Sequence, residues 1–395
     1  MEQIKIKGVD ENVYYEKLDN GLPVYMLVNK HVNSFYITFS AKYGSIHTEY
    51  GLNDGKTYQV HNGVAHFLEH VNFNERDGYT AHDYFRKIGS NINAFTTFDF
   101  TCYEVMGTSK FKSNLVHLLD YVQTPYFTKD LISKEKGIIV EEVKMGMNNP
   151  GHKLYYGMNK CLYKKDKRRN LVTGEVDDVL NTTVEELQSV YETFYHPENM
   201  FLIITGNFKV EEALRIIKDN QKGKLFIDYK KPVIKGEEEP LEVNKEYECI
   251  EANVEIPKLK VSYKMPYSLF LEYDKVTLNM YLNLLCRCNF GNISLFREEL
   301  LNNNLVNLDS SFESVVGLLD AREASLVLQD KKGNYLGNTL LMNGTDLGKV
   351  FAIKDNEIVS LDVFEEYSIK PVINVKNVNM DGIGSIDNPY VLKED

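Results

Sequence analysis

The stretch HNGVAHFLEH, residues 61–70, holds three of the nine histidines and determines how the rest of the chain is interpreted. On a helix, His66 and His70 are one turn apart on the same face, so both side chains can reach a single ion. Glu69 lies beside them. Imidazole nitrogens bind zinc readily, and a carboxylate next to a zinc-bound water can accept its proton. The spacing therefore predicts a zinc site with Glu69 as general base; the alternative is a surface helix with two histidines.

A third ligand is predicted in the segment SKEKGIIVEEVKMGMNNP, residues 133–150. Glu135 and Glu142 are two turns apart on one helical stripe, whereas Glu141 points about 100° away from Glu142. We therefore predict Glu142 as the third ligand of one Zn²⁺ per chain, and Glu135 as a supporting carboxylate that orients a ligand. The alternative for both glutamates is a solvated acidic helix face.

The surrounding sequence predicts an α+β fold, with a mixed or antiparallel sheet and helices on one of its faces. Alternating or apolar runs predict strands at residues 14–43, 93–107 and 199–208, and within residues 14–43 a DNG turn separates the pieces YYEKL and LPVYMLV. Helical periodicity predicts helices at residues 62–73, 80–89, 111–123, 129–148, 184–195 and 209–220. Thr80 and Gly89 are typical first and last residues of a capped helix.

Composition changes along the chain predict four segments. The segments are a catalytic domain at residues 1–228, a linker at 229–255, a shortened second α/β domain at 256–340 and a small β-rich C-terminal tail at 341–395. The linker is predicted because its sequence is charged, contains prolines and has no clear period. No role is assigned to the tail, which could reflect a natural truncation or a fusion.

Charge and composition exclude two classes of partner. The net charge of −12 comes without a dense Lys/Arg block, so we expect no nucleic acid partner, and residues 160–170, the one basic cluster, are expected to form a solvated loop. No run approaches the roughly 20 apolar residues of a membrane helix, and the start lacks an apolar signal region.

The five cysteines are odd in number and lack CxxC spacing. We therefore expect reduced thiols and a cytoplasmic location.

The chain resembles the pitrilysin/insulinase family of zinc metallopeptidases with the inverted HxxEH motif, in its bacterial processing-peptidase-like branch. Four segments in family order carry the resemblance: GVAHFLEH (63–70), GSNINAFTTFDFTCYEVMG (89–107), EKGIIVEEVKM (135–145) and YETFYHPENMFLIITGNF (191–208). Family members have two related domains of similar size. Here the similarity fades after about residue 336, which implies a shortened second domain.

The resemblance assigns roles residue by residue. It implies His66, His70 and Glu142 as zinc ligands, Glu69 as general base, Glu135 as the supporting glutamate, and Asn93, Ala94 and Phe95 as the edge strand that pairs with the substrate backbone. For Asn93 the alternative is a residue that simply caps its strand.

Together these features predict a zinc-dependent endopeptidase that hydrolyses peptides or unfolded polypeptides. One alternative is a non-catalytic or conditionally active subunit that needs a homologous partner chain, or a second copy of itself. Another is a zinc-stabilised binding module, which would close its metal site with a fourth protein ligand.

Overall fold

The computed structural model describes residues 1–5, 12–52, 55–236, 238–254, 258–264, 275–291 and 294–303, together with five short strands between residues 339 and 392. The chain divides into two compact units. The first contains residues 1–156 and 165–238, and the second contains residues 157–164 and 239–395.

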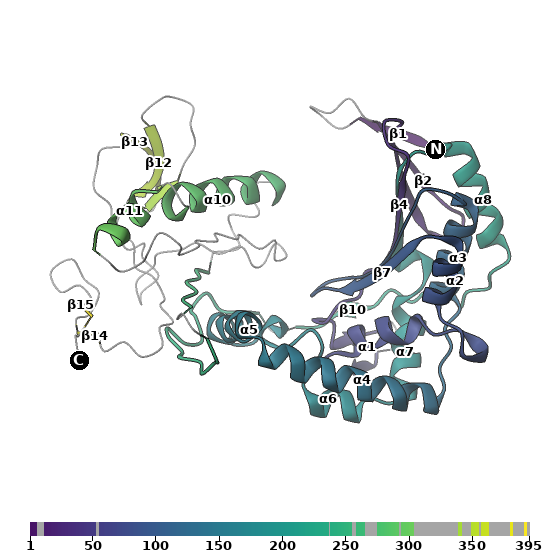
Figure 1. The fold of residues 1–395 in the computed structure, drawn as a ribbon, viewed down its shortest axis with the longest axis horizontal. Coiled ribbons are helices and arrows are strands. Elements are labelled where there is room, and N and C mark those ends of the chain that lie inside the picture. Colours follow the sequence, from purple (N-terminus) through teal and green to yellow (C-terminus); the bar gives the residue numbers. More distant parts are fainter. Residues whose placement is uncertain are drawn as a thin grey trace. The chain divides into compact units, whose positions relative to one another are not determined.

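The first unit is built on a seven-stranded sheet with the order β1-β2-β3-β9-β4-β8-β7 (Figure 1). Its strands are β1 (Glu2–Lys5), β2 (Asn12–Lys17), β3 (Pro23–Val28), β4 (Phe35–Ala41), β7 (Asn91–Thr96), β8 (Thr101–Gly107) and β9 (Met200–Gly206). β3 and β9 are parallel, and all other neighbours in this sheet are antiparallel. The predicted mixed sheet is confirmed, and so is the β2–β3 hairpin, whose turn uses Gly21 at φ 86°.

Helices cover one face of this sheet. The helices that contact its strands are α1 (Val64–Asn72), α2 (Ala81–Ile88) and α3 (Phe111–Gln123). Of the other helices, α8 (Val210–Lys222) packs on α3, α4 (Lys129–Asn148) and α7 (Val184–Phe194) pack on α1, and α6 (Val176–Asn181) packs on α4. Figure 1 shows α2, α3 and α8 on the same side of the strands. Side-chain alternation explains this: Phe35, Ile37 and Phe39 of β4 are buried, whereas Tyr36 between them is exposed. The prediction of helices on one face is confirmed.

Smaller elements complete the first unit. β5 (Glu49–Gly51) pairs with both β6 (Thr57–Gln59) and β10 (Val233–Ile234). Short 3₁₀ turns are η1 (Arg76–Gly78), η2 (Lys167–Arg169) and η3 (Pro197–Asn199). β10 lies within the segment predicted as a linker. The predicted caps of α2 are confirmed: the Thr80 hydroxyl accepts a hydrogen bond from the Asp83 amide, and Gly89 ends the helix in the left-handed conformation.

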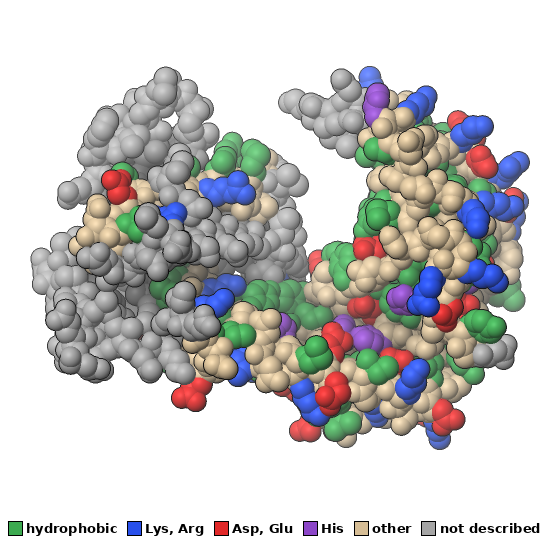
Figure 2. All heavy atoms as spheres, viewed as in Figure 1, with side chains coloured by type: hydrophobic (Ala, Val, Ile, Leu, Met, Phe, Trp, Pro, Cys, Tyr) green, Lys and Arg blue, Asp and Glu red, His purple; other side chains and the backbone are tan. Residues whose placement is uncertain are grey.

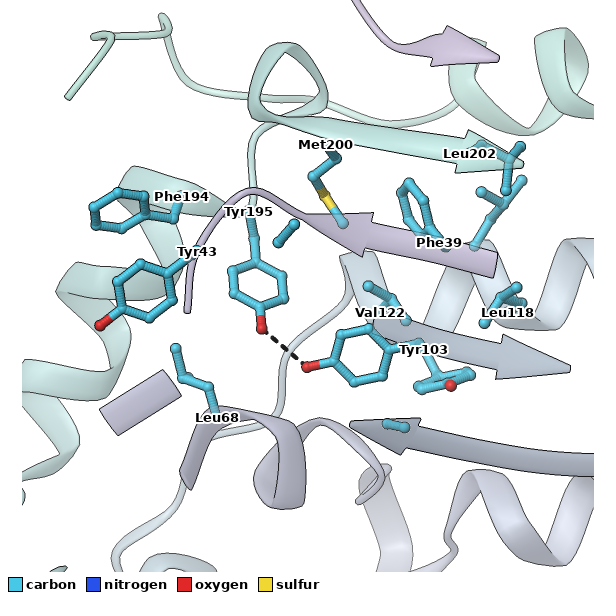
Figure 3. Packing of buried hydrophobic residues seen from close by; sticks show 14 of the residues in the cluster. Phe39, Tyr43, Leu68, Tyr103, Leu118, Val122, Phe194, Tyr195, Met200 and Leu202 are labelled. Atoms are coloured by element: carbon cyan, nitrogen blue, oxygen red, sulfur yellow. Dashed lines mark hydrogen bonds between the residues drawn. The ribbon is translucent and has the colours of Figure 1, made fainter. Parts of the chain in front are cut away.

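Aromatic side chains fasten α1 to the sheet (Figure 3). The hydroxyls of Tyr103 on β8 and Tyr195 are 2.9 Å apart, and Asn72 on α1 donates a hydrogen bond of 2.7 Å to the Tyr103 hydroxyl. Leu68 of α1 packs in the same fully buried cluster. Buried hydroxyl groups need hydrogen-bond partners. The bond from Asn72 to Tyr103 therefore holds α1 at a fixed distance from the sheet.

The basic cluster at residues 160–170 is only partly a loop. Its first residues belong to α5 (Pro150–Leu162), and Arg168 is 2% exposed. Asp166 compensates the charge of the buried guanidinium, because its Oδ1 accepts a hydrogen bond of 2.8 Å from Arg168 Nε. The prediction of a solvated loop is therefore wrong for these residues. On the face that Figure 2 shows, the Lys and Arg side chains of the first unit lie among Asp and Glu.

The second unit contains two described helices, α10 (Lys275–Phe290) and α11 (Leu295–Asn302). Ser294 caps α11 by accepting a hydrogen bond from the Arg297 amide. Five strands follow: β11 (Thr339–Leu341), β12 (Lys349–Lys354), β13 (Glu357–Asp362), β14 (Met380–Asp381) and β15 (Val391–Leu392). Across the described parts of both units, no helix combines the length and the apolar character needed to span a membrane.

Candidate metal centre

The helix that contains HFLEH is held at its first turn by a close backbone contact. Gly63 precedes α1 at φ 82°, and a Cβ at this position would lie 2.2 Å from the carbonyl oxygen of Thr173. Beside it, the Asn62 amide is hydrogen-bonded to Asn170 (2.9 Å) and to Asp178 (3.3 Å). The start of α1 is thus fixed against the segment around residue 173.

α1 is buried on nearly every side, although it contains three ionisable side chains. His66 and Glu69 are each 8% exposed, and their neighbours on the helix are apolar and buried. A helix that is buried all round is normally apolar, and buried ionisable groups need partners. The partners of these side chains therefore define the site.

The two histidines of α1 and Glu142 of α4 converge on one point. His66 Nε2 is 3.5 Å from Glu142 Oε1, and His70 Nε2 is 3.3 Å from Glu142 Oε2. One ligand atom from each residue can be chosen so that all three lie within 4.8 Å of one another. Nitrogen and oxygen ligands bound tetrahedrally to zinc at 2.0–2.2 Å are about 3.4 Å apart. The donor set and its spacing fit a zinc ion.

The outer nitrogen of His70, Nδ1, also fits a metal site. His70 Nδ1 is 3.5 Å from Glu135 Oε2, and Glu135 is 5% exposed. Asn74 donates hydrogen bonds to Glu135 Oε1 (3.3 Å) and to the His70 carbonyl (3.1 Å). This carboxylate–histidine arrangement is typical of metal-bound imidazoles. His66 Nδ1 is buried and has no hydrogen-bond partner among the residues that the structure describes.

Without a metal, the contacts of His70 favour its protonated form. Burial is the largest effect and lowers the pKa of His70, but hydrogen bonds to Glu135 and Glu142 outweigh it and raise this pKa to about 9. Hydrogen bonds from His66 and His70 hold the pKa of Glu142 well below its usual range. A cation is therefore favoured between these side chains, and zinc binding would displace the proton from His70.

Glu69 is next to the cluster but is not one of its members. Its Oε2 accepts a hydrogen bond of 2.6 Å from Thr96 Oγ1 on β7, so the carboxylate is held from the side of the sheet. This position suits a base that acts on a bound water rather than a fourth ligand.

The predicted substrate strand lies at the edge of the sheet. β7 pairs with β8, and within the described part of the chain no strand pairs with its other edge. Asn93 and Phe95 are exposed, whereas Ala94 between them is 9% exposed. α1 contacts both α4 and β7 (Figure 1), so the helix that contains two of the metal ligands lies directly against the strand with the open edge. An open edge can accept an extended peptide by main-chain hydrogen bonds.

Two family models match the chain. The Insulinase (Peptidase family M16) model matches residues 55–172, and the Peptidase M16 inactive domain model matches residues 181–307. The protein described as the uncharacterized zinc protease YmfH of Bacillus subtilis (strain 168) is 39% identical over 316 residues, which cover 78% of this chain and 72% of YmfH. The chain belongs to peptidase family M16, the insulinase family. The predicted membership is confirmed, and the first match contains the whole metal cluster.

Solved M16 structures have the same fold. An M16-like peptidase from Alicyclobacillus acidocaldarius is 29% identical, with a TM-score of 0.69 over 76% of this chain and 70% of that one. A protease from Helicobacter pylori, 20% identical with a TM-score of 0.61, covers 74% of this chain and 68% of its own, and supports the fold alone. A zinc protease of Rickettsia bellii is 29% identical over 210 residues, and the chain spans 48% of its length.

Sequence reasoning did not single out Thr96 and Asn74 in this M16 site. Thr96 directly follows the predicted substrate residues Asn93, Ala94 and Phe95, and alternation along β7 places it on the same face as the buried Ala94. Asn74 is four residues after His70 and bonds back to its carbonyl. Both signals are visible in the sequence only once the strand face and the helix end are known.

Proposed function

We propose that this M16 protein is a zinc-dependent endopeptidase that hydrolyses peptides or unfolded polypeptides. The observation that carries the proposal is the set of three ligand atoms from His66, His70 and Glu142 at zinc-like separations, with the Glu69 carboxylate beside them. Membership in a family whose relatives include named zinc proteases supports the same chemistry.

In this proposal each side chain has one task. His66, His70 and Glu142 hold one zinc ion, which when bound polarises the scissile carbonyl and lowers the pKa of a coordinated water. Glu69 accepts the proton of the attacking water and then delivers it to the leaving amine. The Nδ1–H of His70 points at the Glu135 carboxylate, and this contact presents the other ring nitrogen, Nε2, to the metal.

The substrate is proposed to bind in extended conformation along the open edge of β7. The backbone of Asn93, Ala94 and Phe95 would donate and accept the main-chain hydrogen bonds, and the exposed Asn93 amide can reach the peptide backbone. Main-chain recognition selects for unfolded segments because a folded protein has already paired these groups.

The ligand count favours catalysis over a zinc-stabilised binding module. Within the described ranges, the cluster has three protein ligands and no fourth His, Cys, Asp or Glu joins it. The Glu142 side chain is 47% exposed, so solvent reaches the cluster from that side. Catalytic zinc sites keep one position open for water, whereas structural zinc sites are closed by four protein ligands.

A cytoplasmic location is proposed from the thiols. All five cysteines are free, which suits a reducing compartment. One structural relative, PqqL from Escherichia coli, is described as periplasmic. Fractionation of cells that express the tagged protein tests the proposal, and recovery with periplasmic markers would contradict it.

The test of function is cleavage of a mixed set of unstructured peptides, measured by mass spectrometry. Glu69→Gln should bind zinc yet cleave nothing, and a chelator should abolish cleavage by the unmodified protein. Glu141→Gln, an exposed position on α4, is the matched control and should retain activity. Cleavage by Glu69→Gln would remove Glu69 as the base. Zinc binding without any cleavage by the unmodified protein would instead favour a subunit that needs a homologous partner, and co-purification would identify that chain.

A further inference from the structure

We infer that Thr96 is the positioning residue that holds the Glu69 carboxylate for proton transfer, and that β7 thereby places the base and the peptide substrate together. This inference rests on the proposed function. It concerns a residue next to the expected substrate strand that is neither a metal ligand nor the base.

The contact itself is short and sheltered. Thr96 Oγ1 donates to Glu69 Oε2 at 2.6 Å, and the Glu69 residue is 8% exposed. Hydrogen bonds from a hydroxyl to an ionised carboxylate are short and about twice as strong as those between neutral groups. Among the described residues, Thr96 is the hydrogen-bond donor to the Glu69 carboxylate. Its loss would leave the carboxylate without an orienting partner.

The contacts of the neighbouring Thr101 hydroxyl determine the direction of the Thr96 hydroxyl hydrogen. Thr101 Oγ1 donates its own hydrogen to the carbonyl oxygen of Tyr43 at 2.9 Å, and Thr101 is fully buried. Thr96 and Thr101 are 3.5 Å apart, so this contact is weak. A hydroxyl has one hydrogen, and an ionised carboxylate only accepts. The Thr96 hydrogen is therefore free to point at Glu69.

The geometry of the strand makes this hydroxyl well suited to positioning. Ala94 and Thr96 share the face of β7 that is turned toward α1, whereas Asn93 and Phe95 are on the opposite face. Threonine is β-branched, so its χ1 angle is restricted. The same short strand would thus bind the peptide backbone at its edge and fix Glu69 from one face. A carboxylate displaced by about 1 Å can cost on the order of 100-fold in rate.

The test compares Thr96→Val, which keeps the side-chain shape without the hydroxyl, with Thr96→Ser, which keeps the hydroxyl. We expect Thr96→Val to lower kcat by roughly 10–100-fold with KM and zinc content unchanged, and Thr96→Ser to restore most of kcat. Thr38→Val on β4 applies the same substitution elsewhere in the sheet and should behave like the unmodified protein.

A second measurement does not depend on activity. Crystal structures of the metal-free Thr96→Val and Thr96→Ser proteins should show the Glu69 carboxylate displaced in the first and in place in the second. An unmoved carboxylate in Thr96→Val overturns the inference, as does equal loss of kcat in both variants or a loss of zinc. If Thr96→Val keeps its full kcat while Glu69→Gln is inactive, only this inference is contradicted. If Glu69→Gln is active, the proposed function itself is contradicted.

Discussion

Glu135 and Glu142 are two turns apart on α4, and their carboxylates reach opposite nitrogens of the same imidazole, that of His70. Glu135 Oε2 is 3.5 Å from Nδ1, and Glu142 Oε2 is 3.3 Å from Nε2. One helix therefore determines both the orientation of the ring and the ligand opposite it. Since α4 packs directly on α1, a shift of either helix against the other would change the spacing of the three ligand side chains.

The adjacent glutamates of α4 give the cleanest test of the ligand set. Glu142→Gln should lose zinc on dialysis, with affinity reduced by more than the roughly 10–100-fold that loss of an outer partner costs, because a neutral amide replaces a charged ligand. The fold should survive since the Glu142 side chain is 47% exposed. Zinc per chain, measured by atomic spectroscopy, should stay near one in Glu141→Gln. Equal zinc content in both variants would remove Glu142 from the ligand set.

Asn74 is expected to act on the metal through Glu135 and His70. Asn74→Ala removes the hydrogen bonds to the Glu135 carboxylate and the His70 carbonyl, so zinc affinity should fall by about 10-fold while the fold is kept. Asn181→Ala is the matched control, because Asn181 also donates to a carbonyl four residues earlier, at Asp177 on α6. Competition with a chromophoric chelator measures the affinity. An unchanged affinity in Asn74→Ala would contradict the assignment.

The metal-free protein should show a pH-dependent contribution from the Glu142 contact. The pKa of His70 is raised from an ordinary value of 6.5 to about 9, so its stabilisation is complete below about pH 6.5 and is lost as pH rises through about 9. The pKa of Glu142 is lowered, so its part is present above its ordinary value of 4.5 and is lost as pH falls further. Glu142→Gln should therefore destabilise the metal-free protein most between about pH 5 and pH 8.

Denaturant unfolding of the metal-free unmodified protein and of Glu142→Gln, measured across this pH range, tests the sign. The difference in free energy of unfolding should shrink as pH rises through about 9. A difference that grows above this pH would mean that His70 is not the partner of Glu142. Glu141→Gln, whose side chain is 68% exposed and pairs only at the surface with Lys144, should show little pH dependence in the same assay.

The parts of this site that follow from helical periodicity could be predicted from the sequence. His66, His70, Glu135 and Glu142 repeat at intervals of one or two turns, and the period alone puts them on shared faces. Asn74 lies beyond the end of α1, where the helical period no longer places it. Thr96 required knowledge of which face of β7 meets α1, and this is a tertiary relationship between residues far apart in the chain.

The same limit applies to the fold. Local signals placed the β2–β3 hairpin and the caps of α2, because turn and cap residues act on their near neighbours. β9 inserts between β3 and β4 in parallel to β3, and β10 pairs with β5 from within the predicted linker. Such long-range pairings depend on which strand edges are free after the other elements have packed, and no local pattern encodes that. Arg168 is a similar case, since its burial depends on segments packed around it.

Gly63, which precedes α1 in the left-handed conformation, allows a test of whether the position of α1 depends on its close contact with Thr173. In Gly63→Ala the new Cβ would be 2.2 Å from the carbonyl oxygen of Thr173, in addition to the strain of φ 82°. Gly89→Ala is the matched control, because Gly89 has φ 79° but no atom within 4 Å of the added Cβ. The control should lose about 1–2 kcal/mol of unfolding free energy from backbone strain alone.

Gly63→Ala should lose more unfolding free energy than this control and should also lower zinc affinity, because we expect the clash to be relieved by a shift of α1, which contains two of the three ligands. Calorimetric unfolding and chelator competition on both variants separate the two effects. If both variants lose stability equally and bind zinc as the unmodified protein does, the segment around Thr173 can move aside. The position of α1 would then depend on the buried contacts of Leu68 and Asn72 rather than on the backbone contact at its first turn.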